Sequence, residues 1–208
     1  MLTVYGDIQS GNCYKIKLLL SLMGRSHRWK HVDILAGQTR QPKFLARNLN
    51  GKIPVLELAD GRCLAESNAI LYYLAQGSAW LPDDSFERAQ VLQWQYFEQY
   101  SHEPFIAVAR YIQHYLGLPE ERRDEYQAKQ AGGHRALEVM NKHLAQQDWF
   151  ASQDYSIADI SLYAYTHVAH EGGFDLQPYT HINAWLERVA QHPRHVRMQD
   201  CPRADHNG

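Results

Sequence analysis

The stretch Ser10-Gly11-Asn12-Cys13 lies between a short apolar run, Leu2-Thr3-Val4-Tyr5, and a longer run from Cys13 to Met23. The first run is typical of a β-strand, and the second repeats apolar residues at helical spacing, with Lys15 and Lys17 off the apolar face. A strand that leads directly into a helix leaves the first backbone N–H groups of the helix unpaired, at the positive end of its dipole. The turn is therefore expected to hold an anion such as a thiolate.

Composition excludes several classes of protein. The chain has 208 residues, of which 45% are hydrophobic, and a net charge of -2, so a basic nucleic-acid footprint is not expected. No apolar run approaches the roughly 20 residues of a membrane span, and the N-terminus does not resemble a secretory signal. Three widely spaced cysteines form no CxxC pair. We therefore expect a cytoplasmic protein that binds neither nucleic acid nor membrane.

The first 77 residues alternate between strand and helix signals in the order β-α-β-α-β-β-α, which predicts a four-stranded sheet with helices on its faces. Asp60-Gly61 is a tight-turn signal between the last two strands, and Gly24 is expected to end the first helix in a left-handed conformation. Ser67 or Asn68 is the expected N-cap of the third helix. The expected strands are residues 2–5, 29–34, 55–58 and 62–64, and a short second helix is expected over 42–47.

After a polar linker at 78–86, the pattern is helical only, over residues 87–208. A long helix is expected from Arg88 to Leu116 with a kink at Pro104, and another from Glu120 to Ala145, loosened by Gly132-Gly133. Ser156-Ile157-Ala158-Asp159 reads as a capping box before a buried helix. A last helix is expected over 182–189. The polar tail from Pro193 is expected to fray, and the irregular spacing of its metal-binding residue types predicts no metal site there: His192, His195, Cys201 and His206.

Four motifs together resemble the cytosolic glutathione S-transferase superfamily, in a bacterial form with a serine-type active site. They are the turn at Ser10, the segment Gly51-Lys52-Ile53-Pro54-Val55-Leu56 with an expected cis-proline, the segment Leu64-Ala65-Glu66-Ser67-Asn68-Ala69-Ile70, and the capping box at Ser156. The resemblance implies a thioredoxin-like α/β domain over 1–77 and an all-α domain over 87–208. It also implies glutathione as co-substrate, no metal, and a homodimer, with Glu98 as a guess for a residue that completes the partner's site.

The resemblance implies a role for each residue of the glutathione site. Ile53 would pair its backbone with the cysteinyl part of glutathione, and Lys52 would pair with the glycine carboxylate, although a solvated loop lysine is the alternative. Glu66 would hold the γ-glutamyl ammonium. Ser67 would donate to the γ-glutamyl carboxylate, helped by the helix N-terminus behind it. Simple helix capping is the alternative for Glu66 and Ser67, and it is compatible with binding.

Ser10 is the residue that we expect to activate glutathione, because a hydroxyl that donates to a thiolate lowers the pKa of the thiol. Asn12 can also donate from its amide, and Cys13 could form a mixed disulfide with glutathione. The alternative for Ser10 is an N-cap alone. Serine stands where a thioredoxin-like CxxC motif has its attacking cysteine, which favours Cys13 as a structural thiol. Tyr5 lies on the strand before the turn and is not at the position that the serine-type pattern uses.

The electrophile pocket is expected between the two domains, lined by aromatic residues of the long helix. The residues proposed for it are Tyr111, Tyr115 and His102, and further candidates are Tyr100, Phe105 and Tyr163. The favoured function is transfer of glutathione to small hydrophobic electrophiles. A glutathione-dependent disulfide reductase or peroxidase and a non-enzymatic binding protein remain as alternatives, because one fold supports several functions.

Overall fold

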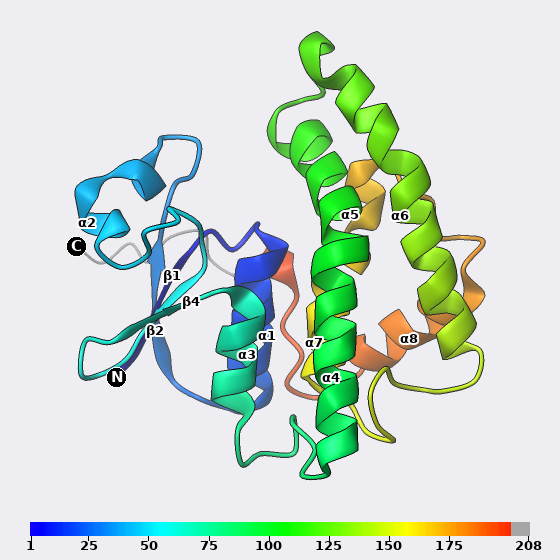
Figure 1. Cartoon of the computed structure of the whole chain (residues 1–208), viewed down its shortest axis with the longest axis horizontal. Helices are drawn as coiled ribbons and strands as arrows, with labels where there is room; N and C mark the ends of the chain where they lie inside the picture. Colours follow the sequence, from blue (N-terminus) through cyan, green and yellow to red (C-terminus); the bar gives the residue numbers. More distant parts are fainter. Residues whose placement is uncertain (201–208) are drawn as a thin grey trace. The chain divides into compact units, whose positions relative to one another are not determined.

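The computed structural model describes residues 1–200 of the chain. Internal contacts divide the chain into two units. The first unit contains residues 1–76 and the described tail residues from His192, and the second contains residues 77–191. Figure 1 shows the sheet in the first unit and the long helices in the second. Among the described residues, no helix is both long enough and apolar enough to cross a membrane.

The first unit is built on a four-stranded sheet of order β2-β1-β3-β4, in which β1 and β2 are parallel and the other pairs are antiparallel. This confirms the predicted thioredoxin-like arrangement. The second strand begins two residues and ends three residues earlier than predicted, because its pairing with β1 runs from His27 to His31, opposite Leu2 to Gly6. The elements are β1 (Leu2–Gly6), α1 (Gly11–Leu22), β2 (His27–His31), α2 (Pro42–Leu45), β3 (Val55–Glu57), β4 (Cys63–Ala65) and α3 (Ser67–Ala75).

The two faces of the sheet follow from the alternation of side chains along its strands. Tyr5 and Val55 point to one face and pack with Val32 and with Phe44 of α2. The opposite face carries α1 and α3, which run side by side (Figure 1). Gly6 allows α1 to approach this face, since a Cβ atom there would overlap the sulfur of Cys13 at 2.6 Å.

Helix α1 is buried on nearly all sides, so its buried surface extends beyond the predicted apolar stripe and includes Lys15. Lys15 is 0% exposed, although Lys17, two positions further on, is partly exposed. A helix that packs against a sheet, a neighbouring helix and a third segment buries more than one stripe. The third segment is the tail of the chain.

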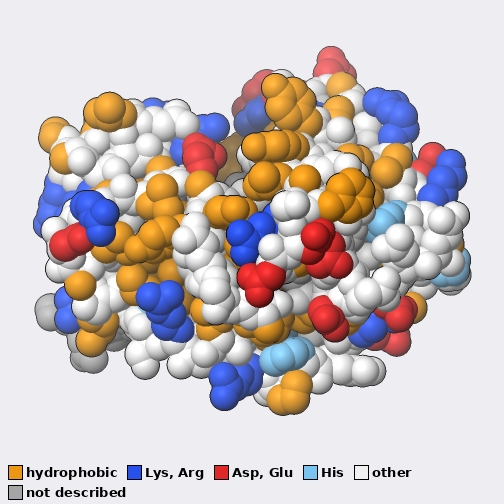
Figure 2. Space-filling view, turned by 60° about the horizontal axis from the view of Figure 1, so that its bottom comes forward, with side chains coloured by type: hydrophobic (Ala, Val, Ile, Leu, Met, Phe, Trp, Pro, Cys, Tyr) orange, Lys and Arg blue, Asp and Glu red, His pale blue; other side chains and the backbone are white. Residues whose placement is uncertain are grey.

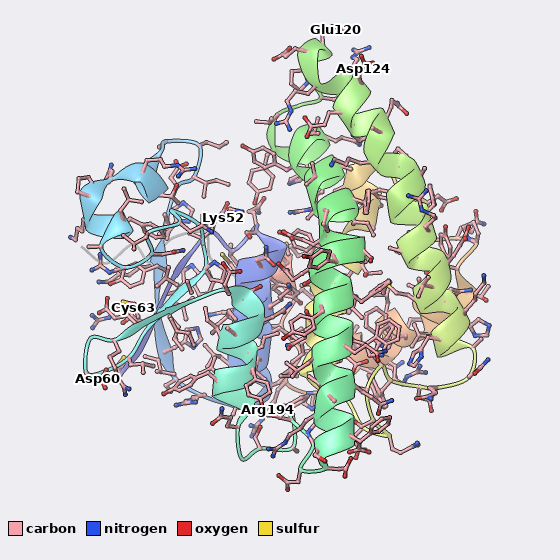
Figure 3. The ribbon with its side chains drawn as sticks, viewed as in Figure 1. Lys52, Asp60, Cys63, Glu120, Asp124 and Arg194 are labelled. Atoms are coloured by element: carbon pink, nitrogen blue, oxygen red, sulfur yellow. The ribbon has the colours of Figure 1, made fainter. Side chains whose placement is uncertain are left out.

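The tail is held against α1 over the described residues, which corrects the expectation that it frays. The Ser21 hydroxyl donates to the Arg194 carbonyl at 2.9 Å, and the Tyr14 hydroxyl donates to the Val196 carbonyl at 2.7 Å. Met198 is buried. Figure 3 labels Arg194 near the C-terminal end of α1. Cys201 and His206 lie outside the described residues.

The second unit, residues 77–191, contains helices joined by loops and no strand. Its long helical rod contains a π-helical turn at Glu98–His102, directly before α5 and Pro104, where the sequence predicted a kink. Proline removes one backbone hydrogen bond, and a wider turn accommodates that loss. The elements are α4 (Ser85–Phe97), α5 (Glu103–Arg110), a second π-helical turn (Tyr111–Tyr115), α6 (Arg123–Leu144), α7 (Ile157–Thr166) and α8 (Thr180–Ala190). Short 3₁₀ turns lie at Gln38–Arg40, Glu120–Arg122, Ala169–Gly172 and Met198–Asp200.

Gly132 and Gly133 do not loosen α6, which continues without a break through both residues. A Cβ atom at Gly132 would overlap the ring of Phe105, and one at Gly133 would overlap the ring of Phe174. The two glycines therefore let neighbouring aromatic side chains pack directly on the helix backbone. Their role is close packing, which local propensity does not reveal.

The capping box at the start of α7 is present as predicted. The Ser156 hydroxyl accepts the Ala158 N–H at 3.3 Å, and the Asp159 carboxylate accepts the Ser156 N–H at 3.0 Å. The other carboxylate oxygen of Asp159 accepts from the Phe150 N–H at 3.2 Å and the Trp185 indole N–H at 3.0 Å. Burial raises the pKa of Asp159 to about 6. One buried carboxylate thus joins three segments of the second unit.

Candidate functional site

Ser10 stands at the N-cap of α1 with extended backbone geometry, φ -74° and ψ 124°. Its carbonyl accepts the N–H groups of Cys13 and Tyr14 at 3.0 and 2.8 Å, which starts the helix. Within the described chain, its hydroxyl makes no capping hydrogen bond to the first turn. A serine at this position ordinarily accepts such a bond. Capping therefore does not occupy the Ser10 side chain, which instead hydrogen-bonds to the Cys13 thiol.

Cys13 is completely buried in the first turn of α1. Burial raises the pKa of its thiol to about 12, and this effect outweighs the hydrogen bond from the Ser10 side chain, which lowers the pKa. A thiol with so high a pKa carries almost no thiolate at neutral pH, and the thiolate is the nucleophile. The geometry therefore supports the structural interpretation of Cys13.

The first turns of α1 and α3 meet through a triangle of polar side chains. The Lys15 ammonium donates to the Asn12 side-chain oxygen at 2.8 Å and to the Ser67 hydroxyl at 3.3 Å. The Ser67 hydroxyl donates to the same Asn12 oxygen at 3.1 Å. Two helix N-termini, each with unpaired N–H groups and partial positive charge, are thereby brought together. Such an arrangement suits a ligand with more than one anionic group.

Glu66, and not Ser67 or Asn68, is the N-cap residue of α3, so the predicted N-cap was wrong by one or two positions. Its backbone has φ 65° and ψ 114°, which is rare for a residue with a side chain, and its side chain is exposed. Strained backbone of this kind costs on the order of 1–3 kcal/mol and gathers at functional sites. Ser67 is the first helical residue and is buried.

The loop that enters β3 is shaped by Asn48. Its side-chain amide donates to the Lys52 carbonyl at 2.7 Å, and its side-chain oxygen accepts the Asn50 N–H at 3.1 Å. The Lys52 side chain is exposed at the edge of the first unit (Figure 3). Ile53 is partly buried against the α2 side of the sheet, and its peptide bond to Pro54 is cis, as expected from the sequence.

Tyr5 belongs to a different network. Its hydroxyl donates to Glu57 at 2.9 Å and accepts from Lys30 at 3.3 Å, while the Arg47 guanidinium lies 4.6 Å from its ring centre. Arg47 also donates to Glu57 at 3.0 Å and holds the pKa of that carboxyl below its usual range. Tyr5 therefore serves packing on the α2 side of the sheet.

Comparison with known proteins assigns the family. The N-terminal domain of glutathione S-transferase matches residues 1–76, and the C-terminal domain matches residues 94–193. The chain belongs to the glutathione S-transferase family. A crystal structure of a glutathione S-transferase from Pseudomonas fluorescens Pf-5 is 62% identical with a TM-score of 0.94, over 96% of this chain and 99% of that one.

Two curated relatives of the family carry different activities in their names. The disulfide-bond oxidoreductase YfcG of Escherichia coli K12 is 31% identical over 88% of this chain and 87% of its own length. Glutathione S-transferase 2 of Anopheles gambiae is 30% identical over 100% of this chain and 95% of its own length. The relatives therefore show the family, but their names do not decide between conjugation and disulfide chemistry.

The residues expected for the electrophile pocket lie in the helical unit. Tyr111 and Tyr115 are partly exposed in the second π-helical turn, with ring centres 5.5 Å apart. His102 is fully buried and bonds to the Thr166 hydroxyl at 2.9 Å, which favours a core role for it. Glu98 is also buried, and it accepts from Gln99 at 2.8 Å. Among residues 1–200, no group of three or more His, Cys, Asp or Glu could hold a metal ion.

Sequence reasoning missed two residues that hold the candidate site together, Lys15 and Asn48. Lys15 was placed only off the apolar stripe of the helix, although its spacing of three from Asn12 places both on the same side of the helix. Asn48 follows the short second helix and precedes Asn50-Gly51, where asparagine side chains commonly bond to backbone two residues on. That turn signal was present in the sequence.

Proposed function

We propose that this chain is a glutathione transferase that activates the thiol of glutathione through Ser10 and transfers the thiolate to small hydrophobic electrophiles. The observation that carries the proposal is the hydroxyl of Ser10, which stands at the N-terminus of α1 without capping it. A hydroxyl donor and a helix N-terminus both stabilise a thiolate relative to the thiol. The nucleophile then comes from the substrate, and the protein lowers the pKa of its thiol.

The remaining glutathione contacts extend from this turn. The charged groups of the γ-glutamyl end would be bound at the start of α3, with Glu66 on the ammonium and Ser67 on the carboxylate. Lys52 would hold the glycine carboxylate, and the backbone of Ile53 would pair with the cysteinyl part. Residues 1–76 carry ten Lys and Arg against five Asp and Glu, which suits an anionic tripeptide.

Asn12 is the alternative donor to the sulfur. Its side-chain oxygen already accepts from Lys15 and Ser67, and this fixes the orientation of the amide. An amide held in this way orients the start of α1, and we assign it the secondary role beside Ser10. Tyr111 and Tyr115 offer partly exposed aromatic surface for an apolar electrophile, whereas the burial of His102 favours a core role over the electrophile contact expected from the sequence.

Disulfide reduction is the second candidate, favoured by the similarity to the oxidoreductase of Escherichia coli K12. It would use the same bound glutathione thiolate, which attacks a small disulfide, releases one thiol and leaves a mixed disulfide. A second glutathione thiolate then displaces the remaining thiol and yields oxidised glutathione. Buried Cys13 takes no part in either step.

One assay separates these functions. The purified protein is mixed with glutathione and either a chlorinated nitroaromatic or a small disulfide such as bis(hydroxyethyl) disulfide, and the initial rates are compared. We expect the aromatic to be conjugated with the larger kcat/KM. A larger kcat/KM for the disulfide would assign the reductase, and absence of glutathione binding at millimolar concentration would leave a non-enzymatic role.

A homodimer in the cytoplasm also belongs to the proposal. Phe86 and Tyr96 of α4 are 69% and 64% exposed, and Tyr100 of the π-helical turn that follows is 85% exposed. Their spacing places them on one side of the helix. Hydrophobic side chains reach the surface in several places, as the orange groups of Figure 2 show. Exposed aromatic residues that share one face often mark a protein interface. Sedimentation equilibrium would show a dimer, and a concentration-independent monomer would contradict it.

A further inference from the structure

Lys15 is the one lysine of the described chain whose side chain is completely buried. Lysine is almost never fully buried unless its ammonium is partnered, because removal of the charge from water is costly. The ammonium of Lys15 donates hydrogen bonds to two side chains of the proposed glutathione site, Asn12 and Ser67. A buried charge at this place points to a function beyond packing.

The three side chains are linked in a defined order. Ser67 has a single hydroxyl proton, which it donates to Asn12, so its oxygen accepts from Lys15. When a carboxylate arrives at the start of α3, the hydroxyl can rotate to donate to it while Lys15 still holds the oxygen. A cation that donates to a hydroxyl oxygen makes that hydroxyl a stronger donor. It also adds positive charge behind the carboxylate.

We propose that Lys15 is a positioning residue for the γ-glutamyl carboxylate of glutathione. It does not touch the ligand. It polarises Ser67 from behind and, through Asn12, ties this carboxylate subsite to the turn that carries Ser10. The inference rests on the proposed function, since it assumes that glutathione is the ligand.

The test removes the charge on the protein and the carboxylate on the ligand separately. The variants are Lys15→Met and Lys15→Gln, and Lys17→Met on the same helix is the matched control. The ligands are glutathione and γ-aminobutyryl-cysteinyl-glycine, which lacks only the γ-glutamyl carboxylate. Calorimetry measures the Kd of each pair, and steady-state kinetics measure KM and kcat for glutathione.

We expect Lys15→Met to raise the Kd and KM for glutathione about tenfold or more, since hydrogen bonds that involve charged groups are the strong ones. The kcat should change less than about threefold, because the group acts on binding. The truncated ligand should bind the variant and the wild type equally. Lys17→Met should bind both ligands as the wild type does.

Equal weakening of both ligands would show that Lys15 only supports the fold, and an unchanged Kd for glutathione would show that it has no role in binding. Either result overturns the inference. If Lys15→Met does not fold, Lys15→Gln decides, because it keeps a donor and loses the charge. We expect it to weaken glutathione selectively, and to a smaller extent than Met. Failure of the wild-type protein to bind glutathione would instead refute the proposed function.

Discussion

Two helices of the described chain, α1 and α7, have serine as the N-cap residue, and the two serines are used in opposite ways. At the start of α7, the Ser156 hydroxyl accepts a first-turn N–H and Asp159 completes the capping box. At the start of α1, the Ser10 hydroxyl makes no capping bond within the described chain. Ser156 is buried and Ser10 is partly exposed. The difference teaches that a serine before a helix has a stability role where its box is complete and can have a chemical role where it is not.

The largest expected effect is a loss of stability when the capping box of α7 is removed. Asp159→Ala removes an acceptor of four hydrogen bonds, from Phe150, Trp185 and both donors of Ser156. Buried donors without a partner are costly, so we expect a loss of about 3–5 kcal/mol in the free energy of unfolding. Urea unfolding followed by tryptophan fluorescence measures it. A loss below about 1 kcal/mol would mean that the box does not organise the second unit.

A smaller change in the free energy of unfolding is expected as the pH rises from about 4 to 6. Burial raises the pKa of Asp159 to about 6 in the folded state, above its ordinary 3.8. The folded protein therefore keeps this proton between about pH 4 and 6, where the unfolded chain has released it. The stabilisation from this group is full below pH 4 and is lost as the pH rises through 6, by about 2–3 kcal/mol.

The measurement compares urea unfolding of the wild type and Asp159→Asn from pH 4 to pH 7. We expect the difference in unfolding free energy between them to shrink as the pH rises. A difference that grows with pH would mean that the four hydrogen bonds outweigh burial and lower the pKa of Asp159.

Ser156→Ala removes only the hydroxyl that caps α7, and so tests the stability role of that serine alone. We expect it to cost about 1 kcal/mol, in the usual range of about 0.5–2 kcal/mol for loss of an N-cap. Glutathione turnover should stay within twofold of the wild type, because Ser156 belongs to the second unit and caps α7. Thermal melts and steady-state rates provide both numbers. A lost activity with unchanged stability would reverse the assignment.

Ser10→Ala should give the smallest effect on stability, below about 0.5 kcal/mol, because no capping bond is lost. The same thermal melt measures it beside Ser156→Ala. Equal losses of stability in the two variants would mean that Ser10 caps α1 in solution.

Much of the fold could be predicted from the sequence, because local signals and tertiary structure agree there. The order of strands and helices, the turn at Asp60-Gly61, the cis Pro54 and the capping box at Ser156 all depend on nearest neighbours in the chain. Each of these features favours a particular residue type, as the positive φ of the turn favours glycine at position 61.

The features that the sequence did not reveal depend on contacts with distant segments. Lys15 is buried because a neighbouring helix and the tail cover α1. Gly132 and Gly133 make room for aromatic rings whose positions the helix itself does not determine. The N-cap of α3 falls on Glu66 at positive φ, and no local propensity favours that conformation for glutamate. The residues of the candidate site stay predictions, while the polar triangle of Lys15, Asn12 and Ser67 was not expected from the sequence.

The central claim is that Ser10 stabilises the thiolate of bound glutathione, and titration of that thiol tests it most directly. The ultraviolet absorbance of the thiolate is followed against pH at saturating glutathione, in the wild type, in Ser10→Ala and in Asn12→Ala. We expect the pKa of the bound thiol to be about 1–2 units higher in Ser10→Ala than in the wild type, with less change in Asn12→Ala. The same thiol pKa in Ser10→Ala and the wild type would contradict the account.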